Sequence, residues 1–155
     1  MLVFKVLHIL SMFTMVTVFL GSEFFYAFAI RQRDVRALAW VHRTVRQGRV
    51  AVVGLVALIA GVAFGLLAAG TGGLDFFKGW LIAAYVLVAL FLVNSAVLGE
   101  KLIRLADQAV EADAGKRPTD QVVRDMTTSA AFTFFAMNGA IFAAIILDMV
   151  LKPFE

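Results

Sequence analysis

The chain contains no cysteine and only two histidines, and these absences exclude several classes of protein. Without cysteine it can form no disulfide, no iron–sulfur cluster, no cysteine-ligated zinc site and no covalently attached c-type haem. It also lacks a His-Glu-x-x-His pair, a Walker loop, a nucleophile elbow and a Cys–His pair. These motifs mark many metalloproteases, nucleotide-binding proteins and hydrolases. The sequence therefore names no reaction, and it leaves open whether the protein is an enzyme.

Charged residues are scarce as well. They make up 16% of the 155 residues, whereas 62% are hydrophobic and the mean hydropathy is +0.91. Soluble domains are usually about half apolar and about a quarter charged, so this composition indicates an integral membrane protein. The net charge of +3 does not predict a nucleic-acid partner, because the basic residues lie in short loops between apolar runs.

Four apolar stretches are long enough to cross the hydrocarbon core of a bilayer, which takes about 20 helical residues. They cover residues 5–30, 50–70, 76–98 and 129–151. The first stretch carries one lysine and continues past Ser22, so we interpret it as a retained helix rather than a signal peptide. The sequence predicts an all-α integral membrane protein in which residues 1–155 form a single four-transmembrane-helix bundle.

The basic residues predict the orientation of this bundle. Six arginines lie between the first two spans and five basic residues lie between the last two, which accounts for eleven of the 14. The positive-inside rule places both loops in the cytoplasm. We therefore expect a multi-pass protein of the bacterial inner (plasma) membrane with both termini on the outer side. Within the first loop, helical spacing of apolar residues around Trp40 predicts a short interfacial helix.

Small residues recur on two spans. The second span contains Gly61-x-x-x-Gly65, and the fourth has Ala136, Ala140 and Ala144 at intervals of four. Small side chains let helix backbones approach closely inside a membrane. We expect these rows to pack within the bundle. The alternative is that they join copies into a homo-oligomer or join the chain to a larger membrane complex, in addition to the contact with lipid.

Ionisable side chains inside a span are functional candidates, because burying them in lipid is costly. Lys5 and His8 lie near the start of the first span, and Asp148, Met149 and Lys152 lie near the end of the fourth. The two spans run in opposite directions, so both groups are expected at the outer edge of the bilayer. The outer edge is therefore the principal candidate site.

One interpretation of this site is b-type haem. A four-helix bundle can hold haem between facing helices, with a neutral imidazole as axial ligand. His8 would be that ligand, and Met149 or Met12 a second one. Lys5 and Lys152 would pair with the propionates.

Two other interpretations of His8 stay open. His8, Met12 and Met15 share one helical face, and their imidazole and thioether groups suit Cu(I). In the third interpretation His8 is a structural residue that forms a hydrogen bond with Asp148, and the methionines fill the core.

Further polar residues lie towards the inner edge or in the first loop. Glu23 can relay protons or form an ion pair with Arg31 or another loop arginine, and we favour the ion pair. Asn94 is expected near Glu23, and Asn138 is expected to make an interhelical hydrogen bond. We expect His42 to be solvated in its arginine-rich loop, about 50 Å from His8 along the chain, which excludes bis-histidine haem ligation. Tyr26 is interpreted as one of several aromatic anchors at the interface.

Three segments carry a resemblance to known proteins. They are Lys5-Val-Leu-His8-Ile, the stretch from Gly79 to Asn94, and the ending Met149-Val-Leu-Lys152-Pro153-Phe154. The chain resembles a family of four-helix bacterial integral membrane proteins of uncharacterised activity, CopD-type copper-resistance membrane domains and HemJ-type protoporphyrinogen oxidases. The HemJ resemblance implies that His8 is associated with haem and that Lys5 is its neighbour. The chain departs from that group at Met15, where the group usually has tryptophan.

Together these observations predict a small haem-b-associated inner-membrane protein with an electron-transfer or redox role. The alternatives are a copper-handling membrane protein and a non-catalytic membrane subunit or scaffold.

Overall fold

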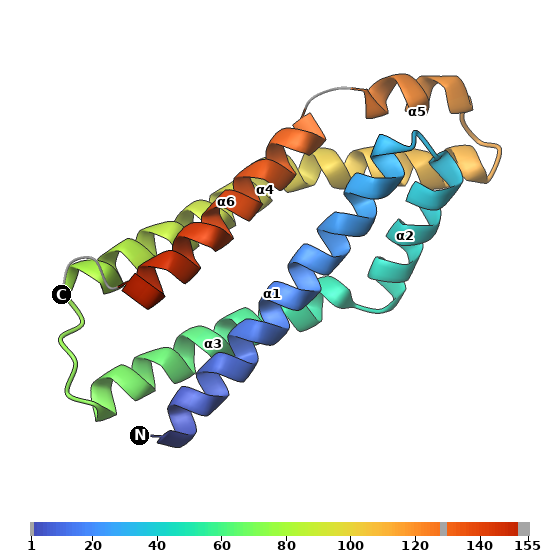
Figure 1. Cartoon of the computed structure of the whole chain (residues 1–155). Coiled ribbons are helices and arrows are strands. Elements are labelled where there is room, and N and C mark those ends of the chain that lie inside the picture. Colours follow the sequence, from blue (N-terminus) through green and yellow to red (C-terminus); the bar gives the residue numbers. More distant parts are fainter. Residues whose placement is uncertain (1, 128–129, 152–155) are drawn as a thin grey trace.

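The computed structural model describes residues 2–127 and 130–151, and these residues form six α-helices and no strand (Figure 1). The helices are α1 (Leu2–Arg31), α2 (Val35–Gln47), α3 (Val50–Thr71), α4 (Gly79–Asp113), α5 (Thr119–Met126) and α6 (Ala130–Leu151). Among the described residues, α1, α3, α4 and α6 are long and apolar enough to cross a membrane. The predicted four-span helical fold is confirmed.

The four spans form two antiparallel pairs. Helix α1 packs along α3, and α4 packs along α6, while the described part of α3 has few contacts with α4 or α6 (Figure 1). The pairs meet near mid-length, where Met15 and Leu58 of one pair share a buried cluster with Phe91 and Phe142 of the other. The rings of Phe19 and Phe91 pack edge to face with centroids 5.3 Å apart. Aromatic contacts therefore hold the two pairs together in the middle of the bundle.

The two loops that carry most of the basic residues lie at the same end of the bundle (Figure 1). This end, here called the loop end, consists of α2, α5 and the second half of α4 (Figure 1). Helix α4 has 35 residues, which makes it about 52 Å long and longer than the hydrocarbon core. Its second half therefore extends out of the membrane and supports α2.

The predicted helix in the first loop is present as α2. Its residues Leu38 and Ala39 are fully buried in a core that also contains Ile30, Ala106 and Val122. Trp40 is exposed on the opposite side. Helix α2 thus packs its apolar face against α1 and α4. It fixes the loop end of α1 against α4.

The Gly61-x-x-x-Gly65 row lies in the contact between α1 and α3. A Cβ atom added at Gly61 would lie 2.6 Å from Met12 Sδ, and one added at Gly65 would lie 2.9 Å from His8 Nδ1. The predicted close packing is therefore confirmed for the glycines. Ala136 and Ala140 are exposed, so this part of the alanine row does not pack inside the described chain.

Asp34 caps the first turn of α2, and its removal gives a first testable prediction. Its Oδ1 accepts a hydrogen bond from the backbone N–H of Ala37 at 2.9 Å. We expect Asp34→Ala to lower the free energy of unfolding by about 1 kcal/mol, because a helix N–H loses its acceptor. Thermal unfolding in detergent measures the change, with the exposed neighbour Gln32→Ala as control. Equal midpoints for the two variants would show that the cap contributes nothing.

Candidate functional site

His8 is held between α1 and α3 by a bond to the backbone. Its Nδ1 lies 2.7 Å from the carbonyl oxygen of Gly61. A carbonyl oxygen only accepts, so Nδ1 carries the proton and donates it, and Nε2 keeps a free lone pair. Histidines that bind metals commonly have this arrangement, because the bond fixes both the tautomer and the ring orientation. The ring itself is half-buried.

The other candidate site residues of α1 are Met12, Met15 and Lys5, and they lie in three different surroundings. Met12 Sδ packs against Gly61, the residue to which His8 is bonded. Met15 is buried in the central cluster of the bundle. Lys5 is exposed near the start of the helix. The structure therefore brings Met12 to the same contact as His8 and places Met15 in the hydrophobic core.

The candidate residues of α6 lie near its end. Met149 is half-buried, whereas Lys152 lies outside the described residues. Asp148 is buried, and its Oδ2 has no hydrogen-bond partner in the part of the chain that the structure describes. The hydrogen bond between His8 and Asp148 that the third interpretation included is not formed, and His8 Nδ1 bonds to the Gly61 carbonyl oxygen instead.

The depths of the two residues explain this difference. Asn138 of α6 is bonded to Glu23 of α1, so these two residues lie at the same level. From this common level, both helices extend to the end of the bundle where α1 begins. Asp148 lies ten residues from Asn138 in that direction, and His8 lies fifteen residues from Glu23. At 1.5 Å a residue, Asp148 is about 7 Å deeper than His8.

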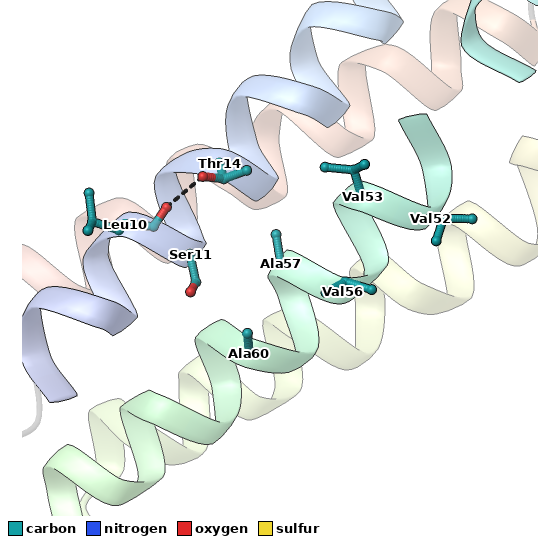
Figure 2. Close-up of a pocket in the computed structure, with 8 residues that line it drawn as sticks. All are labelled: Leu10, Ser11, Thr14, Val52, Val53, Val56, Ala57 and Ala60. Carbon is teal, nitrogen blue, oxygen red and sulfur yellow. Dashed lines mark hydrogen bonds between the residues drawn. The ribbon is translucent and has the colours of Figure 1, made fainter. Parts of the chain in front are cut away.

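A groove of about 430 Å³ lies between α1 and α3 (Figure 2). Its lining residues are Leu10, Ser11, Thr14, Val52, Val53, Val56, Ala57 and Ala60. The hydroxyl of Thr14 donates to the carbonyl oxygen of Leu10 at 2.8 Å. The wall is therefore almost entirely apolar, and His8 is not among the residues that form it.

A second polar site is buried where α1, α4 and α6 meet. Asn138 is fully buried, and its Nδ2 donates to Glu23 Oε1. Its Oδ1 accepts from Asn94 Nδ2 at 2.6 Å. The interhelical hydrogen bond predicted for Asn138 is confirmed, and so is the position of Asn94 near Glu23. We call these three residues the carboxylate–amide network.

The ion pair expected between Glu23 and Arg31 or another loop arginine is not found among the described residues. Arg31 is exposed, and it follows Glu23 by eight residues, which is about 12 Å along the helix axis. Glu23 instead points to Asn138 and is 8% exposed. A buried carboxylate whose described hydrogen-bond partner is a neutral amide is unusual, because desolvating a charge is costly.

The third polar site lies at the loop end, and it was not predicted from the sequence. Tyr26 Oη lies 2.8 Å from His42 Nδ1, and His42 Nε2 lies 3.0 Å from Asp107 Oδ1. Arg46 Nη1 lies 3.6 Å from the same carboxylate oxygen. His42 is only 7% exposed. We call Tyr26, His42 and Asp107 the tyrosine–histidine–aspartate chain.

Two expectations are thereby corrected. His42 was expected to be solvated, but it is buried. Tyr26 was expected to anchor the chain at the membrane interface, but it is buried and bonded to His42. The signal lay in the spacing of α2, because His42 follows the buried Leu38 by four residues and so shares its face. The arginines around His42 concealed this pattern.

Asp107 determines which atoms donate hydrogen bonds in the tyrosine–histidine–aspartate chain. Asp107 is half-exposed and accompanied by Arg46, and an ionised carboxylate only accepts hydrogen bonds. Nε2 of His42 therefore donates to Asp107. Nδ1 is then the acceptor, and the hydroxyl of Tyr26 donates to it.

Within the described residues, no three His, Asp or Glu side chains gather in a way that could hold a metal ion.

Comparison with known proteins gives one match. The family described as predicted integral membrane protein (DUF2269) matches residues 2–153. No curated protein and no solved structure matches the chain at a significant level. This match shows no link to the CopD or HemJ groups. Because it covers nearly the whole sequence, the chain belongs to the DUF2269 family of predicted integral membrane proteins.

Proposed function

We propose that this protein is a small haem-b-associated membrane protein with a redox or electron-transfer role, in which His8 is the axial ligand. The observation that carries the proposal is the bond from His8 Nδ1 to the Gly61 carbonyl oxygen. It leaves Nε2 free and makes the imidazole a better electron donor. Bound haem would supply one-electron chemistry at the iron.

The remaining residues suit a single histidine ligand. His42 is bonded to Tyr26, and Tyr26 lies eighteen residues after His8, or about 27 Å along α1. That distance excludes both histidines as ligands of one iron. The second position would be taken by a thioether from Met12 or Met149, or would stay open. Lys5 is exposed and free to reach a propionate, and Lys152 is the second cation that we propose for this role.

Copper binding is a second candidate, and the contact at Gly61 favours it. His8 and Met12 both touch this residue, so an imidazole and a thioether come from consecutive turns of one face. Cu(I) prefers such soft ligands. Met15 would have to leave the central cluster to complete the set.

The test is an optical spectrum of the detergent-purified protein produced with ample haem. We expect a Soret band, with α and β bands on reduction, and we expect His8→Ala to lose all of them because the iron loses its ligand. His42→Gln is the control and keeps the bands, because His42 belongs to the loop end.

The absence of a Soret band from the wild-type protein would overturn the haem proposal. Copper analysis of the wild type, of His8→Ala and of Met12→Leu would then decide the second candidate. If the wild-type protein contains neither haem nor copper, the result would favour a non-catalytic subunit. Its contact with a partner would include the exposed Ala136 and Ala140.

A further inference from the structure

The carboxylate–amide network and the tyrosine–histidine–aspartate chain occupy consecutive turns of α1. Glu23 and Tyr26 are three residues apart, which is about 4.5 Å along the helix axis and the same side of the helix. Both side chains are buried. Glu23 bonds to Asn138, which lies inside the span, and Tyr26 bonds to His42, which lies at the loop end. Two buried hydrogen-bonded groups, one ending at the half-exposed Asp107 and one containing Glu23, therefore lie on neighbouring turns of α1.

Packing alone does not account for this composition. Two amides suffice to join α4 to α6, as Asn94 and Asn138 do, and adding Glu23 to them brings the cost of burying a carboxylate. Similarly, phenylalanine would fill the space of Tyr26 without a hydroxyl that needs a buried partner. Ionisable groups inside membrane spans are typical of proton relays.

We propose that Asp107, His42 and Tyr26 conduct protons between the loop end and Glu23, and that Glu23 is a proton-binding site inside the membrane. The proposal includes one water between the Tyr26 hydroxyl and the Glu23 carboxylate as the remaining step of the path. The inference goes beyond the proposed function and does not depend on a bound cofactor.

Every step of this path conserves protons. To release a proton, Glu23 passes it through the water to the Tyr26 oxygen, while the Tyr26 hydroxyl proton moves to His42 Nδ1. The Nε2 proton of His42 then moves to Asp107, which gives it to solvent. Proton uptake starts from the other tautomer of His42, which carries its proton on Nδ1. Asp107 then donates a proton to Nε2, the Nδ1 proton moves to the Tyr26 oxygen, and the Tyr26 hydroxyl proton moves through the water to Glu23. Each group gives one proton and receives one.

The charges around the path suit these roles. Asp107 of α4 faces Arg46 of α2, so the entry group has a counter-charge and contact with solvent. Within the part of the chain that the structure describes, Glu23 is bonded to the amide of Asn138 from α6 and, through it, is linked to the amide of Asn94 from α4. Among its described hydrogen-bond and ion-pair partners there is no lysine or arginine to hold the carboxylate permanently ionised.

Infrared spectroscopy of the full-length protein in lipid nanodiscs tests the proposal. A rapid pH drop from a caged proton donor should produce the C=O stretching band of a protonated carboxylic acid, which Glu23→Gln removes. We expect Tyr26→Phe to slow the rise of this band about a hundredfold, the usual contribution of a positioned proton donor. Tyr85→Phe is the matched control, because Tyr85 is exposed on α4, and it should leave the rate unchanged.

Asp107→Asn provides a second cut in the path. The side chain is half-exposed, so the substitution preserves the fold and removes only the carboxylate that exchanges protons with solvent. It should slow the same band. If both variants protonate Glu23 at the wild-type rate, the path is wrong. If the wild type shows no band that Glu23→Gln removes, Glu23 binds no proton and the proposal is overturned. The haem spectrum is a separate measurement, so either proposal can fail alone.

Discussion

Replacing Asn138 with leucine is expected to lower the free energy of unfolding by about 3 kcal/mol. Asn138 is fully buried and makes two hydrogen bonds, donating to Glu23 and accepting from Asn94. Leucine makes neither, so a carboxylate oxygen and an amide N–H both lose their partner away from water. Each buried polar atom left without a partner costs more than an average hydrogen bond contributes. The loss should therefore exceed that for a conservative apolar exchange at an exposed neighbour on the same helix.

Unfolding in mixed micelles, followed by circular dichroism, measures the change. Met137→Leu is the control, because Met137 is the exposed neighbour on the same helix, and it should stay within about 0.5 kcal/mol of the wild type. The triple variant with leucine at Glu23, Asn94 and Asn138 should recover most of the loss, since no buried polar partner remains. A single variant as stable as the wild type would show that the network does not stabilise the fold.

The architecture follows from the sequence because two strong physical constraints determine it. Apolar runs of about 20 residues have one stable solution in a bilayer, a helix that satisfies its own backbone. The basic residues fall into two loops, and the structure places both at the loop end (Figure 1). Asn138 was also predictable as an interhelical donor, because an amide inside a span must find a partner.

The tyrosine–histidine–aspartate chain was not predictable in the same way. His42 and Asp107 are 65 residues apart in sequence, and they meet only because α2 folds back onto the extension of α4. The spacing of apolar residues along α2 shows which face of the helix is buried. Which residues that face contacts depends on tertiary packing. For the same reason the sequence indicated that Gly61 and Gly65 pack closely without showing that His8 lies against them.

This contact between Gly65 and His8 leads to the second large effect. A methyl group at Gly65 would lie 2.9 Å from Nδ1 and 3.0 Å from Cε1 of His8, closer than atoms can pack. The imidazole is rigid and its Nδ1 is bonded to Gly61, so it cannot move aside without losing that bond. We expect Gly65→Ala to lower the free energy of unfolding by about 1–3 kcal/mol, the usual cost of overpacking.

Two matched substitutions separate rigid from flexible contacts. Alanine favours a helix over glycine by about 1 kcal/mol, and Gly139→Ala measures that gain, since a Cβ there meets nothing within 4 Å. Gly61→Ala meets Met12 Sδ at 2.6 Å, but a thioether can turn away, so its loss should be smaller than that of Gly65→Ala. If instead Gly61→Ala loses more, the thioether is the fixed group at this contact. Met12 would then be held in place as firmly as His8, as a ligand pair requires.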